Sequence, residues 1–171
     1  MKPRSVYRCL ALGLLLGLPG PAGYVLGDVV LPPILDSGMV LQRDLPVPVW
    51  GRAGAGEKVV VSFAGQSRSV KAGEDGRWML RLDPLKASVE AASMVVEGAN
   101  RITLDNILVG EVWICSGQSN MEWRLIQGMN AREEVAAADH PLIRLFNVPG
   151  HTTSPLPREK GAGSWQVCAP K

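Results

Sequence analysis

The chain has 171 residues, enough for one ordinary domain or for one small domain and part of another. Its hydrophobic content of 46% and charged content of 20% are those of a globular protein. Removing Lys2, Arg4 and Arg8, which lie in an N-terminal leader, from the 18 basic residues leaves 15 against 16 acidic ones, a formal charge of about −1. A near-neutral chain without a basic patch argues against nucleic acid as a partner.

The leader has the pattern of a secretory signal peptide. Its three basic residues precede an apolar run at 9–18, which is too short to span a bilayer, and small residues follow at 19–23. We therefore expect residues 1–23 to be removed and the protein to be exported, to the periplasm or the cell exterior, with no membrane association after cleavage. The alternative, an uncleaved anchor, is disfavoured by the length of the run.

Residues 28–106 are predicted to form an antiparallel β-sandwich. Short apolar runs separated by Gly and Pro turns are typical of that fold. Pro48 favours an edge position for its strand. Trp50 and Trp78 lie within apolar alternations, which favours the core over a sugar-stacking role. The predicted strands cover residues 39–42, 47–50, 57–63, 66–72, 77–82, 93–97 and 101–104.

The next stretch combines a strand pattern with a polar turn. Residues 107–115 are nearly all β-branched, aromatic or apolar, which predicts a strand covered on both faces, as in a parallel sheet. Residues 116–120 then bring together two hydroxyls, two amides and a glycine. A serine after a buried strand lies where open α/β sheets bind ligands. Composition alone favours a plain turn, and the G-x-S-x-G elbow is not met because Met121 replaces its second glycine.

The block Gly-Glu-Val-Trp-Ile-Cys-Ser-Gly-Gln-Ser-Asn-Met-Glu-Trp, residues 110–123, resembles the signature of the sialate O-acetylesterase family, within the SGNH/GDSL-type serine esterases. The resemblance implies that Ser119 is the catalytic nucleophile. Its backbone N–H, with Gln118 or Asn120, would meet the oxyanion or the substrate. Residues 39–43, 48–51, 56–59 and 76–78 resemble the β-domain of the same family, so the resemblance covers roughly residues 29–168.

The resemblance also implies the fold of the remaining chain. Residues 107–171 are expected to be the start of an α/β, flavodoxin-like SGNH-hydrolase domain. Asn130 is predicted to cap a helix that runs to Ala138, with Glu133 completing a capping box. A strand at 142–148 is expected to lie parallel to the strand at 107–115, and residues 149–163 form a surface loop.

Two cysteines follow the leader, Cys115 and Cys168. An exported protein meets an oxidising compartment, so they either form a disulfide or remain as two buried free thiols, and the sequence favours neither. No cofactor or metal is expected, because neither His140 nor His151 has ligand spacing with a cysteine or a carboxylate.

A serine nucleophile requires a base, usually a histidine oriented by a carboxylate. Neither histidine matches the catalytic histidine of the family, which lies far downstream. We therefore expect a partial copy of a longer, secreted carbohydrate esterase that removes O-acetyl groups from sialic acid or related sugars, without turnover as 171 residues. The alternatives are a non-catalytic carbohydrate-binding β-module and an unproductive fragment without a stable fold.

Overall fold

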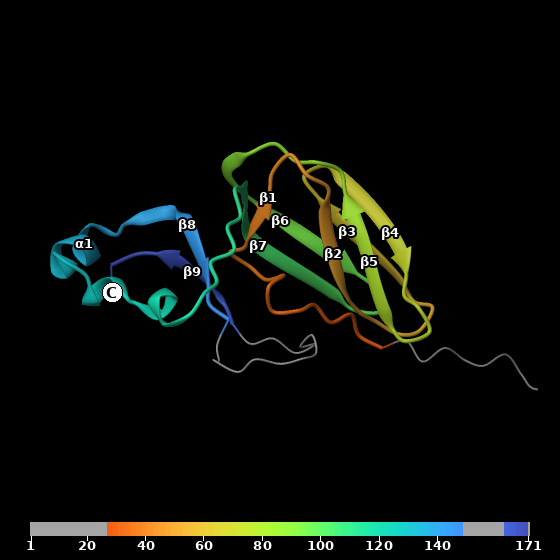
Figure 1. Ribbon diagram of the computed structural model, residues 1–171. Coiled ribbons are helices and arrows are strands. Elements are labelled where there is room, and N and C mark those ends of the chain that lie inside the picture. The colour runs from red at the N-terminus through yellow and green to blue at the C-terminus, as the bar shows by residue number, and fades with distance from the viewer. Residues whose placement is uncertain (1–26, 149–162, 171) are drawn as a thin grey trace, which may run out of the picture.

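The computed structural model describes residues 27–148 and 163–170. These residues form a larger lobe of seven strands and a smaller lobe that carries α1, β8 and β9 (Figure 1). The strands are β1 (Val40–Gln42), β2 (Val47–Arg52), β3 (Lys58–Phe63), β4 (Gln66–Lys71), β5 (Arg77–Leu82), β6 (Ser88–Glu97), β7 (Arg101–Gly110), β8 (His140–Phe146) and β9 (Trp165–Cys168). The helical segments are η1 (Ser119–Glu122), η2 (Leu125–Gln127) and α1 (Ala131–Ala137).

The larger lobe contains a five-stranded sheet of order β1-β7-β6-β3-β4 and a separate β2–β5 pair. The pairs β3–β4, β3–β6, β6–β7 and β2–β5 are antiparallel, but β1 runs parallel to β7. The prediction of a purely antiparallel region is therefore wrong at β1. The long chain between β1 and β7 leaves them free to pair in the parallel sense, which a tight hairpin cannot do. Pro48 lies on β2, and among the described strands β2 forms a ladder with β5 alone. Pro48 was predicted to lie on an edge strand, and this pairing agrees with that prediction.

The core lies between the five-stranded sheet and the β2–β5 pair. Alternate residues of β3 and β5 are buried and join one cluster with side chains from β1, β2, β6 and β7. Trp78 is 4% exposed, so its core prediction is confirmed, whereas Trp50 is half-buried and packs against the edge of the same cluster. The Arg68 guanidinium of β4 binds the Asp83 carboxylate that follows β5, 2.5 Å away, and so links the larger sheet to the β2–β5 pair.

One charged side chain lies inside this lobe. Glu57 is 4% exposed, and its carboxylate accepts hydrogen bonds from the backbone N–H groups of Gly54, at 2.7 Å, and Ala99, at 2.5 Å. These partners belong to the turns before β3 and between β6 and β7. The carboxylate therefore joins two turns that are distant in sequence, and both of its oxygens are bonded.

The expected strand at 107–115 differs from the one observed. β7 begins at Arg101 and ends at Gly110, so it runs through residue 107, where a second domain was expected to begin. Ile107, Leu108 and Val109 are buried in succession, which agrees with a strand covered on both faces. Beyond Gly110 the ladder stops, and the backbone N–H of Val112 donates to the side chain of Gln42. The domain division itself stays a prediction.

The smaller lobe also departs from the expected strand–helix–strand unit. β8 pairs antiparallel with β9 and has no ladder with β7. Asn130 does precede α1, but it adopts a left-handed conformation with φ of 55° and its side chain makes no capping hydrogen bond. The capping-box prediction is wrong because a side-chain cap needs extended backbone at that position. Glu133 and Glu134 occupy the first turn of α1.

Two side chains join the lobes. The Trp165 indole N–H of β9 donates to the carbonyl of Ile34, at 2.9 Å. The Arg144 guanidinium of β8 donates to the side-chain oxygen of Asn106 in β7, at 3.1 Å. Asn106 has a φ of 58°, at a point where the β6–β7 register is irregular.

Candidate active site

The chain between β7 and α1 carries the predicted nucleophile. Residues 111–117 have no regular structure, and Ser119 is the first residue of η1. Gln118 precedes it in an extended conformation, and the Gln118 carbonyl accepts a hydrogen bond from the N–H of Met121, at 2.8 Å. Ser119, Gln118 and Asn120 are all exposed. The backbone N–H groups of Ser119 and Asn120 have no acceptor within residues 27–148 and 163–170, so both can donate to a ligand.

No general base accompanies Ser119 in the part of the chain that the structure describes. Neither a histidine nor a carboxylate there forms a hydrogen bond with its hydroxyl. His140 begins β8, where it pairs with Cys168 of β9, and it is exposed, and its imidazole forms no hydrogen bond with another described residue. His151 lies outside the described residues. The roles of Ser119, Gln118 and Asn120 therefore stay predictions from the resemblance.

Sequence reasoning missed a polar network immediately after β7. The Glu111 carboxylate accepts hydrogen bonds from Arg43 Nε, at 2.7 Å, and from Gln42 Nε2, at 3.1 Å. The Gln42 amide oxygen accepts from the N–H of Val112, at 2.9 Å. Residues 39–43 and 110–123 both carried the family resemblance, but no local pattern indicated that they meet. The parallel pairing of β1 with β7 brings them together.

This network changes the acidity of its members. Hydrogen bonds from Gln42 and then Arg43 lower the pKa of Glu111 below its ordinary 4.5, although Asp44 nearby opposes the shift. The hydrogen bond to Glu111 and the attraction of its charge raise the pKa of Arg43. Glu111 is therefore ionised at neutral pH and holds both of its donors.

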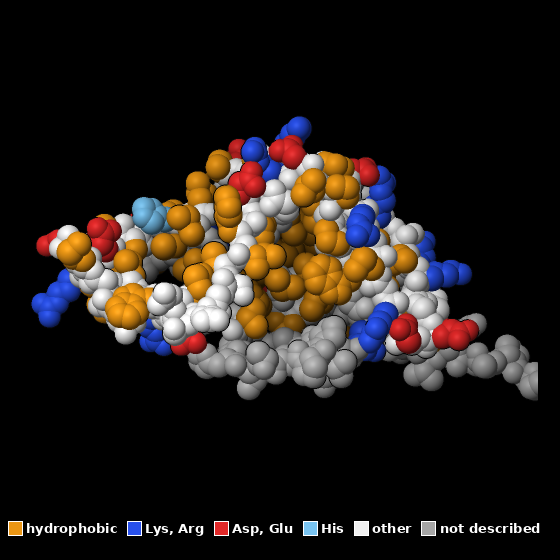
Figure 2. Space-filling view, in the orientation of Figure 1, with side chains coloured by type: hydrophobic (Ala, Val, Ile, Leu, Met, Phe, Trp, Pro, Cys, Tyr) orange, Lys and Arg blue, Asp and Glu red, His pale blue; other side chains and the backbone are white. Residues whose placement is uncertain are grey.

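Large apolar side chains around Ser119 are open to solvent. Trp113 is 83% exposed and Ile114 is 93% exposed. Met121, Trp123, Leu125, Ile126 and Met129 are also exposed. Figure 2 shows hydrophobic side chains at the surface of both lobes. The predicted nucleophile is thus exposed and is flanked along the chain by exposed apolar side chains.

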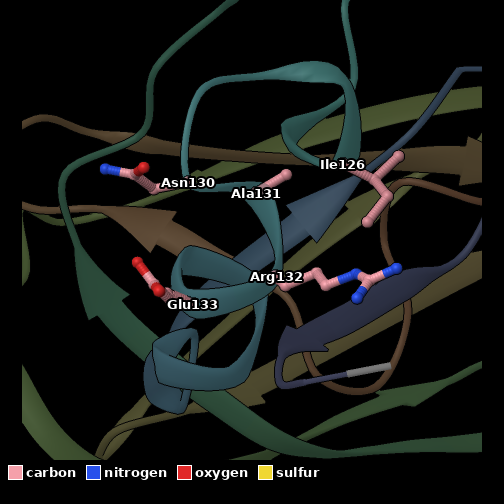
Figure 3. Close-up of a pocket in the computed structure, with 5 residues that line it drawn as sticks. All are labelled: Ile126, Asn130, Ala131, Arg132 and Glu133. Carbon is pink, nitrogen blue, oxygen red and sulfur yellow. The ribbon is translucent and has the colours of Figure 1, made fainter.

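A hollow of about 480 Å³ lies beside α1, lined by Ile126, Asn130, Ala131, Arg132 and Glu133. Figure 3 shows Asn130 and Glu133 pointing to one side, and Ile126 and Arg132 to the other. A binding pocket usually has a few polar groups that converge on one point. Neither that convergence nor Ser119 is present in this hollow, so we do not assign it as the active site.

The two cysteines do not form a disulfide in this structure. Both are free; Cys115 is exposed and Cys168 is half-buried, with its thiol 3.7 Å from the carbonyl oxygen of Ala138. The sequence left a disulfide and two buried free thiols equally open; the structure has two free thiols, of which Cys115 is exposed and not buried. The end of β7 at Gly110 places Cys115 in an exposed segment and not in a covered strand.

The described residues contain no group of three or more histidine, cysteine, aspartate or glutamate side chains able to hold a metal ion. In the same residues, no helix combines the length and apolar character needed to cross a membrane.

No protein-family model matches the chain. A solved structure, that of a carbohydrate acetylesterase from Xanthomonas citri, is similar to it with a TM-score of 0.78 and 37% sequence identity. The match covers 84% of this chain and 33% of the Xanthomonas protein. The chain thus shares its strand-rich fold with part of a carbohydrate esterase.

Two curated relatives identify the family to which the chain is related. Sialate O-acetylesterase of Rattus norvegicus is 34% identical over 126 residues, 67% of this chain and 23% of the rat protein. The Homo sapiens protein of the same name is 33% identical over 127 residues, 67% of this chain and 24% of its own length. The chain belongs to the sialate O-acetylesterase family, as the resemblance at 110–123 predicted. It spans about a quarter of the length of these curated relatives.

Proposed function

We propose that this chain carries the nucleophile of a carbohydrate O-acetylesterase. One observation supports the proposal above the others: Ser119, the serine of the family block, is exposed at the first residue of η1. The relatives are sialate O-acetylesterases and a carbohydrate acetylesterase. The substrate class proposed is therefore an O-acetylated sugar, such as an acetylated sialic acid.

The reaction proposed is acyl transfer through an acetyl-enzyme. Ser119 Oγ attacks the acetyl carbonyl carbon and gives its proton to a base. The oxyanion that forms accepts hydrogen bonds from the backbone N–H of Ser119 and from Asn120 or Gln118. The sugar hydroxyl leaves with a proton, and water then attacks the acetyl-enzyme, releasing acetate and restoring Ser119.

The base is proposed to come from polypeptide outside the described residues, as in a part of a longer esterase. The absence of a base bonded to Ser119 within residues 27–148 and 163–170 supports this. We also propose export, from the leader pattern at residues 1–23, which lie outside the described residues.

The proposal is tested on the protein made by its native source, whose intact mass is measured first. A mass well above 18.3 kDa supports the longer esterase. Acetate release from an O-acetylated sialic acid is then compared for the wild type, Ser119→Ala and Ser116→Ala. We expect Ser119→Ala to lower the rate about 10³-fold or more, whereas Ser116→Ala, an exposed serine of the same segment, keeps most of it.

Acetate release that survives Ser119→Ala would contradict the nucleophile assignment. The 171-residue chain by itself is expected to show no Ser119-dependent turnover, and a rate near that of a full-length relative would contradict the missing base. Sugar binding without turnover, unchanged in Ser119→Ala, would favour the non-catalytic β-module instead.

A further inference from the structure

The segment that leads to Ser119 has very few attachments. Every hydrogen bond that residues 111–117 form within the described chain goes to Gln42 or Arg43. The side chains of these seven residues are exposed and contribute nothing to the core. The direction in which the segment leaves β7 therefore depends on these contacts rather than on packing.

The start of the segment is held by hydrogen bonds at three consecutive residues, Gly110, Glu111 and Val112. The N–H of Arg43 donates to the carbonyl of Gly110, at 2.9 Å, which is the last backbone bond before the segment. The two oxygens of the Glu111 carboxylate are held separately, one by Arg43 and one by Gln42. The Gln42 amide also accepts the N–H of Val112, so one side chain fixes two consecutive residues.

We propose that Gln42, Arg43 and Glu111 are positioning residues that set the path from β7 to the Ser119 turn. We call these three side chains the exit clamp. The inference rests on the proposed function of Ser119, since it gives the clamp its purpose. At the far end of the segment, the Met121 side chain lies so close to Gly117 that an added Cβ would overlap it. The path between the clamp and η1 has little other support.

The clamp is sensitive to acid through Glu111. The charged groups around this carboxylate are Arg43 and Asp44, and Asp44 also pairs with Lys86, at 3.1 Å. Because the folded-state pKa of Glu111 is lowered, the clamp is complete above pH 4.5 and is lost as the pH falls through that lower value. The raised pKa of Arg43 keeps its guanidinium charged throughout this range.

The test is an NMR pH titration of the whole 171-residue chain, labelled with ¹⁵N, from pH 7 to pH 3. We expect the amide signals of Val112 and Ser119 to move together, with one midpoint below 4.5, the ordinary value for Glu111. In Glu111→Gln this shared transition is lost, and both signals stay at positions unlike those of the wild type at pH 7. The control Glu134→Gln, an exposed carboxylate of α1, is expected to keep it.

A Val112 signal that titrates while Ser119 does not would overturn the proposal, since the network would then be a local contact only. Core signals such as the Met94 methyl report whether each variant is folded. If Glu111→Gln is unfolded, Arg43→Lys replaces it, because lysine keeps the charge but lacks the Nε–H that binds Glu111. Unchanged Val112 and Ser119 signals in that variant would also overturn the proposal. The NMR results do not depend on turnover, whereas the nucleophile assignment is tested by the activity of Ser119→Ala. Failure of the clamp proposal and failure of the proposed function are therefore distinguishable.

Discussion

Glu57→Gln is expected to destabilise the larger lobe strongly although it changes a single atom. The Glu57 carboxylate is 4% exposed and accepts one backbone N–H at each oxygen, from Gly54 and Ala99. A glutamine keeps one acceptor but presents an NH₂ group to the other N–H, so two donors then face each other. Gly98 packs so closely that a Cβ there would overlap Glu57, which limits rotation away from the clash.

The expected loss in the free energy of unfolding follows from the two hydrogen bonds that Glu57 accepts. A hydrogen bond to a charged group contributes about 1.5–3 kcal/mol, so losing one and weakening the other lowers the free energy of unfolding by about 2–4 kcal/mol. Urea unfolding followed by tryptophan fluorescence measures this, because Trp78 is buried in the same core. The control is Glu90→Gln, an exposed residue of β6, with a change within about 0.5 kcal/mol. Equal stabilities for the two variants would refute the reasoning.

Two further predictions concern the contact between the two lobes and the exposure of the two cysteines. Single and double alanine variants of Arg144 and Asn106 should show a coupling free energy of about 0.5–1 kcal/mol in urea unfolding, because their hydrogen bond is partly exposed; strictly additive effects would show that the contact does not join the lobes. Cys115 should react with iodoacetamide in the folded protein well before Cys168, since the first thiol is exposed and the second is half-buried. Peptide mass mapping checks this, and equal rates would contradict the positions of the two thiols.

Most of the strands were predictable because their signal is local. Alternation in β3 and β5 shows directly which side chains face the core, and Gly and Pro turns separate the strands. The family block at 110–123 was equally local, since a contiguous run of rare residue types identifies a relative without any tertiary information. The strand-rich lobe, the core position of Trp78 and the family membership could therefore be predicted from the sequence.

The predictions of strand bounds and strand direction were wrong where a residue's hydrogen-bond partner lies far away in the sequence. The apolar run at 107–115 predicts one continuous strand, but β7 ends at Gly110, and the N–H of Val112 then donates to the remote side chain of Gln42. The strand that became β8 has an apolar pattern that allows either direction, and only β9 decided that it is antiparallel.

The amino-acid sequence by itself determined the periodicity of the strands, the turns between them and the identity of the candidate nucleophile, Ser119, since each depends on neighbours along the chain. Only the tertiary structure decided that β1 lies parallel to β7, that Glu57 joins two turns and that the exit clamp forms at the start of the Ser119 segment. The bond from Ala99 to Glu57 and the bonds of the exit clamp join residues about 40 to 70 positions apart, and these hydrogen bonds exist only after the sheet has brought both partners together.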